Sequence, residues 1–231
     1  SPPFQACPIT RFYVPRPELN QSLTEYLKSE SYPGVSVVSA VHGLGGIGKT
    51  TLVAALAHDP SIQELFPGGV LWAELGQTPD ILSLLSDWVQ SLDPYDLTPT
   101  TVTTASSQLR SLLNGNSCLL IIDDAWQADH VRPFLVGESR CRTIVTTRNA
   151  SIARKIGAQL LFVDIFSEEQ AIKLLEARLG NLGAASSEAK QLAAKLGFLP
   201  LALELVGAQI EQGVSWTELL DAFSQSLIDT S

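Results

Sequence analysis

Short, largely apolar runs alternate with amphipathic stretches along the chain as far as residue 163. The runs have the length of buried strands and are bounded by turn-forming residues. Five strands are therefore predicted, over residues 35–41, 70–75, 118–122, 143–147 and 159–163. Between them apolar residues recur at helical spacing, and Thr78-Pro79 predicts the start of one of these helices. Because strands alternate with helices, we expect an α/β fold with a five-stranded parallel sheet covered by helices on both faces.

The pattern changes after Asp164, where no further strand is indicated. Ser167-x-x-Gln170 and Ser215-x-x-Glu218 have the form of capping boxes, which mark the N-termini of helices. Apolar residues recur at helical spacing over residues 168–179, 187–196, 200–211 and 216–227. We therefore expect two domains: residues 1–165, with the sheet and an extended, Pro-rich N-terminal segment, and residues 166–231, a small all-helical bundle.

The composition argues against one class of partner and indicates the compartment in which the protein is expected. With 24 acidic and 15 basic side chains among 231 residues, the net charge is −9, which argues against nucleic acid as the main partner. The three cysteines are an odd number at wide spacing and form no metal-binding or disulfide pattern, so we expect free thiols in a reducing cytoplasm. No apolar run reaches the length of a membrane span, and none is predicted.

Residues 43–50, Gly-Leu-Gly-Gly-Ile-Gly-Lys-Thr, fit the phosphate-loop pattern G-x-x-x-x-G-K-[ST] in full. The segment follows a predicted strand and precedes a predicted helix, which is the context that the pattern requires. Its small residues let backbone N–H groups point at phosphate oxygens, Lys49 can reach the β- and γ-phosphates, and Thr50 can offer its hydroxyl to Mg²⁺. The sequence therefore predicts a nucleotide site with Mg²⁺; the alternative is a glycine-rich turn without a ligand.

Two acids and an arginine follow later strands. The apolar run 119–122 ends in Asp123 and Asp124, which matches the Walker B arrangement. Asp123 is then expected in the magnesium shell, and Asp124 is placed to orient or deprotonate a water molecule; for Asp124, a solvated carboxylate or a loop cap is the alternative. Arg148, at the end of the next strand, could touch the γ-phosphate with its forked guanidinium group, although a surface salt bridge fits its position equally well.

Five segments, in this order, resemble motifs of the NB-ARC (apoptotic-ATPase) branch of the STAND signal-transduction NTPases. They are FYVPRPEL (12–19), GLGGIGKTTL (43–52), LLIIDDAW (119–126), TIVTTR (143–148) and GFLPLAL (197–203), the last with one extra residue between Gly and Leu-Pro. The resemblance covers nearly the whole chain and implies a P-loop NTPase fold followed by a small helical bundle.

The resemblance also implies a set of nucleotide contacts. Val14 and Arg16 would lie beside the adenine and the phosphates, and Pro200 would press on the adenine from the bundle. A proline in the first turn of a helix explains Pro200 equally well. The residues that would hold the phosphates are Gly43, Gly45, Gly46, Ile47, Gly48, Lys49, Thr50 and Thr51.

By resemblance, the chain is the core of a molecular switch that binds ATP or ADP and hydrolyses ATP slowly with Mg²⁺. The catalytic residues would be Lys49, Asp124 and Arg148, and hydrolysis would couple to domain rearrangement and to assembly into homo-oligomers. The family's winged-helix, effector and repeat-sensor domains are not seen in this sequence. Two other functions stay open, a nucleotide-bound scaffold that never hydrolyses and a small-molecule phosphotransferase. A DNA-linked motor of the AAA+ type shares the core, but the acidic charge argues against it.

Overall fold

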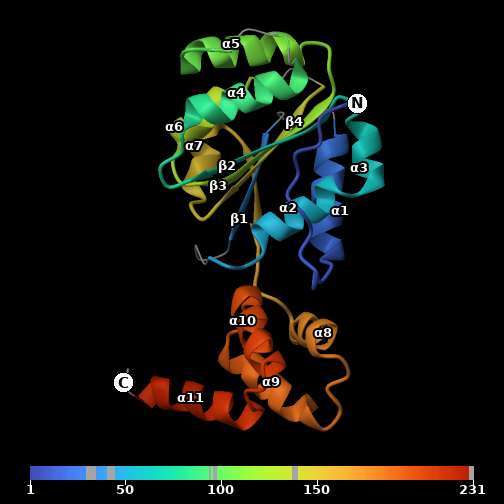
Figure 1. The fold of residues 1–231 in the computed structure, drawn as a ribbon, viewed down its shortest axis with the longest axis vertical. Helices are drawn as coiled ribbons and strands as arrows, with labels where there is room; N and C mark the ends of the chain where they lie inside the picture. The colour runs from blue at the N-terminus through green and yellow to red at the C-terminus, as the bar shows by residue number, and fades with distance from the viewer. Residues whose placement is uncertain (30–34, 41–44, 94, 96–97, 137–139, 229–231) are drawn as a thin grey trace. The chain divides into compact units, whose positions relative to one another are not determined.

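Five parallel strands form one sheet in the computed structural model, which describes residues 1–29, 35–40, 45–93, 95, 98–136 and 140–228. The strands are β1 (Val35–Ala40), β2 (Gly69–Gly76), β3 (Cys118–Ala125), β4 (Arg142–Thr147) and β5 (Gln159–Val163), in the order β2-β3-β4-β1-β5 across the sheet (Figure 1). β3 and β4 pair in parallel, so their C-terminal ends are neighbours. The expected parallel sheet is thus present, and the apolar inner strand β3 is buried along almost its whole length.

Helices cover both faces of this sheet (Figure 1). α4 and α5 lie on one face, and α1, α2 and α3 lie on the other. The bounds are α1 (Pro17–Lys28), α2 (Lys49–Ala57), α3 (Pro60–Leu65), α4 (Ile81–Leu92), α5 (Val102–Leu113), α6 (Ala128–Val131), α7 (Ser151–Ile156) and a 3₁₀ turn, η2 (Arg132–Phe134). Buried residues of α4, α5 and η2 fill the first face, where Trp88 and Phe134 pack edge to face with ring centroids 5.0 Å apart.

The rest of the described chain is helical. It comprises α8 (Glu168–Leu179), a 3₁₀ turn η3 (Gly183–Ala185), α9 (Ser186–Lys195), α10 (Pro200–Glu211) and α11 (Trp216–Ile228). The capping box before α8 forms as predicted, because Gln170 N–H donates to Ser167 Oγ at 3.2 Å and Ser167 N–H donates to Gln170 Oε1 at 3.0 Å. α8, α9 and α10 enclose an apolar core that includes Leu174 and Leu203.

The chain divides into two compact units. The sheet unit comprises Ser1–Ile9, Arg16–Gly45 and Lys49–Val163, and the helical unit comprises Thr10–Pro15, Gly46–Gly48 and Asp164–Ser231. Sequence analysis placed residues 1–165 in one domain, whereas Thr10–Pro15 groups with the helices. The reason is apolar packing: Val14 is only 6% exposed and packs in the helical core with Phe166 and Leu203.

The N-terminal segment covers one edge of the sheet. Phe4 forms an isolated parallel bridge with Val70 of β2. Val70 N–H donates to Pro3 O at 2.9 Å, Gln5 N–H donates to Val70 O at 3.0 Å, and Trp72 N–H donates to Gln5 Oε1 at 3.2 Å. The segment therefore satisfies backbone groups of β2 that an edge strand leaves unpaired.

The described cysteines are free, and a hydrogen bond with Cys141, together with burial, raises the pKa of Cys118. Among the described residues, no helix has both the length and the apolar character needed to cross a membrane. The same part of the chain contains no cluster of three or more His, Cys, Asp or Glu side chains that could bind a metal ion.

Candidate functional site

The glycine-rich loop leads directly into α2. Gly43 lies outside the described residues, whereas Gly46 and Gly48 have φ angles of +74° and +87°. These left-handed conformations favour glycine, and they let the loop curl before the helix begins at Lys49. The loop is buried at Ile47, and Thr51 follows in the first turn of α2.

Lys49 is a buried cation, with only 8% of its surface exposed. Burial lowers the pKa of Lys49, and the nearby Arg148 cation lowers it further, while Asp124 and Asp123 act in the opposite direction. A buried ammonium group is costly unless anionic partners compensate it. The first residue of α2 therefore offers strong positive potential to an anion at the helix N-terminus.

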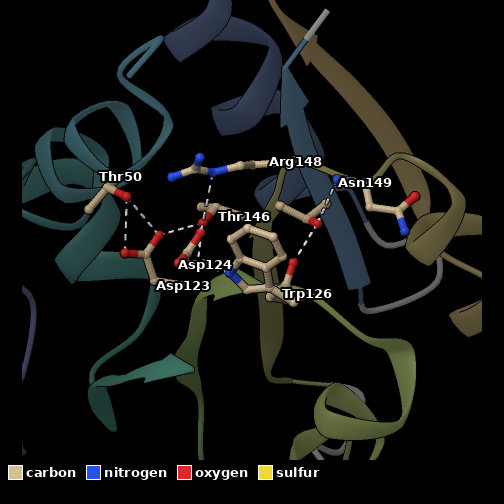
Figure 2. A network of polar contacts seen from close by, with 9 residues as sticks. Thr50, Asp123, Asp124, Trp126, Thr146, Arg148 and Asn149 are labelled. Atoms are coloured by element: carbon tan, nitrogen blue, oxygen red, sulfur yellow. Dashed lines mark hydrogen bonds and ion pairs between the residues drawn. The ribbon is translucent and has the colours of Figure 1, made fainter. Parts of the chain in front are cut away.

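Thr50 and Asp123 form an oxygen pair at the end of β3 (Figure 2). Thr50 Oγ1 lies 2.9 Å and 3.0 Å from the two carboxylate oxygens of Asp123, and the Thr146 hydroxyl also donates to this carboxylate. Asp123 is 3% exposed, and burial is the main cause that raises its pKa; the hydrogen bonds from Thr146 and Thr50 lower it. A hydroxyl and a desolvated carboxylate are the oxygen donors that Mg²⁺ prefers, so the donor set fits this ion.

Asp124 is the next residue after Asp123, and its side chain has different partners from those of Asp123 (Figure 2). Its backbone is left-handed, with φ +51°, and its N–H donates to Thr146 Oγ1 at 2.9 Å. Trp126 Nε1–H donates to Asp124 Oδ2 at 3.1 Å, and Arg148 Nε lies 3.8 Å from Asp124 Oδ1. The predicted acid is therefore partly exposed and engaged by two side chains, an indole and a guanidinium.

Arg148 joins this cluster to the glycine-rich loop. Its Cζ lies 5.4 Å from the centroid of the Trp126 ring. A Cβ atom built on Gly45 would lie 2.6 Å from Arg148 Nη1, so the guanidinium group lies directly against the loop at that glycine. Sequence analysis left open a salt bridge or a phosphate contact for Arg148; the ion pair with Asp124 is present, and the phosphate contact stays a prediction.

The ends of β3 and β4 are shaped by threonines of β4. The pairing of β3 with β4 shifts register between Ile122 and Ala125. Thr147 Oγ1 donates to Ala125 O at 2.6 Å and accepts from Asn149 N–H at 2.9 Å. These bonds fix the turn that places Arg148 opposite the acids.

Sequence reasoning missed two residues of this cluster, Trp126 and Thr146. Thr146 was visible as a polar residue in a strand predicted to be buried, which indicates a hydroxyl with a specific partner. Trp126 was visible only as the last residue of the LLIIDDAW segment. Nothing in its sequence neighbourhood indicates that its N–H reaches Asp124.

Other predicted site residues lie elsewhere in their units. Arg16 is buried in the sheet unit, immediately before α1. Val14 packs in the core of the helical unit, and Pro200 is buried in the first turn of α10. The adenine contacts suggested for these three residues stay predictions.

Comparison with known proteins identifies relatives that match most of the chain. The family model described as "NB-ARC domain" matches residues 18–182. Regulatory protein AfsR of Streptomyces griseus is 33% identical over 190 residues, which covers 79% of this chain and 19% of the relative. Apoptotic protease-activating factor 1 of Danio rerio is 29% identical over 216 residues, covering 87% of this chain and 17% of the relative. The chain thus spans about a fifth of the length of these curated relatives.

Solved structures agree on the fold. A signal transduction ATPase with numerous domains (STAND protein) from Pyrococcus horikoshii, which carries a tetratricopeptide repeat sensor, superposes with a TM-score of 0.63 at 18% identity, covering 96% of this chain and 33% of that one. A structure of the Drosophila ORC bound to DNA gives a TM-score of 0.66 at 14% identity, covering 95% and 63%. At these identities the likeness concerns the fold alone. With the family match over residues 18–182, the chain belongs to the NB-ARC family of P-loop NTPases.

Proposed function

We propose that this chain is the nucleotide-binding core of a signal-transduction switch, and that it binds ADP and ATP together with Mg²⁺. The observation that carries the proposal is the buried Lys49 at the start of α2, next to the Thr50–Asp123 pair. A nucleotide phosphate there offsets the buried charge and meets the N–H groups of the first helical turn, which have no partner within the helix.

The oxygens of Thr50 and Asp123 would hold Mg²⁺. The ion, when bound, supplies charge neutralisation for the nucleotide phosphates. Burial disfavours the negative charge of Asp123 and raises its pKa. A cation beside the carboxylate removes that penalty.

Asp124 and Arg148 would act at the γ-phosphate. Asp124 would orient and deprotonate the attacking water with lone pairs that Trp126 and Arg148 leave unused. Arg148, whose guanidinium group lies against Gly45, would bind the γ-phosphate through its terminal nitrogens. We propose slow hydrolysis, as the family resemblance implies.

The names of the relatives support a switch rather than a metabolic enzyme. They are a regulatory protein and an apoptotic protease-activating factor, and one structural neighbour carries a repeat sensor. We propose that effector and sensor domains flank this core in the full protein. Residues 1–165 and 166–231 would change their relative orientation when the bound nucleotide changes. Binding of ATP would favour homo-oligomers. Val14, Arg16 and Pro200 would contact the nucleotide in this arrangement, and the free thiols fit a cytoplasmic protein.

The first test is the content of the purified protein. Denaturation followed by chromatography is expected to release about one ADP per chain. Lys49→Ala should lower nucleotide affinity by about 100-fold or more, because a charged partner of the phosphates is lost from a buried position. Lys28→Ala, an exposed lysine in the last turn of α1, is the matched control and should bind like the wild type. Equal affinity in the Lys49 and Lys28 variants contradicts the site assignment.

Turnover of added ATP then separates the remaining functions. Slow release of phosphate to water supports the switch. Bound ATP that stays intact supports the scaffold that never hydrolyses. Transfer to an acceptor faster than to water supports a phosphotransferase.

A further inference from the structure

We propose that Trp126 is the positioning residue that aims Arg148 at the γ-phosphate, and that it thereby sets the preference of the site for ATP over ADP. The inference rests on the proposed function. Trp126 is an indole for which the sequence motifs predicted no contact with the nucleotide.

The two ends of the Arg148 guanidinium group have different neighbours. Nε faces Asp124, with 3.8 Å to Oδ1, whereas Nη1, Cζ and Nη2 lie 2.6, 2.9 and 3.3 Å from the position of a Cβ on Gly45. Figure 2 shows the terminal nitrogens pointing away from Asp124. The side chain is therefore already oriented with its two terminal nitrogens at the loop, in the fork that suits a phosphate.

The ion pair with Asp124 is not enough to hold Arg148 in this orientation. The ion pair alone is weak, because 3.8 Å is long and the Arg148 and Asp124 side chains are 47% and 32% exposed. An exposed pair of this kind holds a flexible arginine poorly. Another contact must restrict it.

Trp126 supplies that contact in two ways (Figure 2). Its ring lies beside the guanidinium group, with 5.4 Å between Arg148 Cζ and the ring centroid, within the range of a cation–π interaction. Its Nε1–H fixes the Asp124 carboxylate at 3.1 Å, so the anion that faces Arg148 Nε is itself held in place. Tryptophan combines a π-face and an N–H donor in one side chain, which phenylalanine and leucine do not.

The physical consequence is preorganisation. An arginine that is ordered before the ligand arrives loses less conformational entropy on binding. The gain applies only to ligands that Arg148 touches, so it favours a nucleotide with a γ-phosphate and leaves ADP unaffected. Trp126 therefore acts on discrimination between nucleotides rather than on binding as such.

The experiment is calorimetric titration with ADP and with the non-hydrolysable β,γ-imido analogue of ATP, each with Mg²⁺. In Trp126→Leu, the affinity for the analogue should fall about 3- to 10-fold, the size of a lost cation–π contact and its ordering effect. ADP affinity should stay within about 2-fold of the wild type. Trp126→Phe, which keeps the aromatic face, should lose less than half of this discrimination. Trp126→Met fills a similar volume without a π-face and replaces the leucine variant if that variant does not fold.

A double variant tests whether Trp126 acts on analogue affinity through Arg148. In an Arg148→Ala background, Trp126→Leu should cause no further loss of analogue affinity, because the indole acts through the arginine. An equal loss of ADP and analogue in Trp126→Leu, no change in either, or a further loss without Arg148 overturns the proposal. A wild-type protein that binds neither nucleotide instead overturns the proposed function, and this inference with it; that result is seen before any variant is made.

Discussion

Asp124 occupies a backbone conformation that few side chains tolerate. Its φ of +51° lies in the left-handed region, where aspartate and asparagine are accepted more readily than other residues with a Cβ atom. Thr146 stabilises this conformation by accepting the Asp124 N–H at 2.9 Å. The C-terminal end of β3 therefore stores strain at the residue proposed as the base, and such strain is typical of functional positions.

This conformation predicts different costs for two substitutions of Asp124. Asp124→Asn should change the free energy of unfolding by only a few tenths of a kcal/mol, because asparagine accepts the same φ. Asp124→Ala should cost about 1 kcal/mol, since alanine lacks that tolerance. Urea unfolding of both variants checks this difference.

Both Asp124 variants should bind ADP like the wild type and lose turnover of ATP. Equal unfolding free energies for asparagine and alanine would show that the backbone at Asp124 is not strained. Turnover that survives in both would remove Asp124 from the chemistry.

Sequence pattern located the strands well but placed some element ends wrongly. β3 was predicted over 118–122, yet it continues to Ala125. The reason lies outside the strand: Glu74 and Gly76 of β2 pair with Asp123 and Ala125, which extends the ladder past the acids. Two adjacent acids after an apolar run resemble a turn, and only the neighbouring strand shows otherwise.

Helix α4 gives a second example of a shifted end. Thr78-Pro79 predicted its start, whereas α4 begins at Ile81. Asp80 is the N-cap, with Oδ1 accepting from Ser83 N–H at 3.1 Å. Aspartate and threonine are both good caps, so the choice depends on the backbone path out of β2.

The residues of the candidate site could be predicted from the sequence where they belong to a motif. The loop pattern and the strand ends point to Lys49, Thr50 and the two acids, and the structure brings these side chains together with Arg148. The partners of Trp126 and Thr146 were not predictable, because they depend on the register of β3 against β4. A register shift between strands leaves no periodic signal in a single sequence.

Strand β4 lends itself to a matched pair of substitutions. Thr146→Val removes a hydroxyl that donates to Asp123 and accepts from the Asp124 N–H, and it should lower the free energy of unfolding by about 2 kcal/mol. Thr143→Val, at an equally buried position near the start of the same strand, should cost less than half as much. Thermal or urea unfolding measures both, and equal costs would contradict the role assigned to Thr146.

At the scale of the whole molecule, the helical unit is discontinuous in sequence. Thr10–Pro15 contributes Val14 to its core, while most of the unit comes from Asp164–Ser231. Arg178 adds a second contact with this segment, since its Cζ lies 4.8 Å from the centroid of the Phe12 ring. Residues Thr10–Pro15, which include the first half of the N-terminal motif, are thus a structural part of the bundle, whatever they contribute to the nucleotide.

Val14→Ala should therefore weaken a unit whose main body lies at the other end of the chain. Removing buried methyl groups should cost the helical unit about 2 kcal/mol. Native-state hydrogen exchange should show faster exchange in α8 and α10, with β3 unchanged. Thr10→Ala, an exposed position in the same segment, is the control. Unchanged protection in α8 and α10 would contradict the packing role of Val14.

The shared core of Val14 and Leu203 also sets the order of events when a ribosome makes the protein. Thr10–Pro15 leaves the exit tunnel before the strands of the sheet unit, whereas the helices that enclose Val14 are synthesised after those strands. Contacts between such distant segments carry a large loop-closure cost and form slowly. The sheet unit can form most of its structure while the nascent chain grows, whereas the bundle must wait until the helices after Asp164 are made and then bind a segment that was synthesised much earlier.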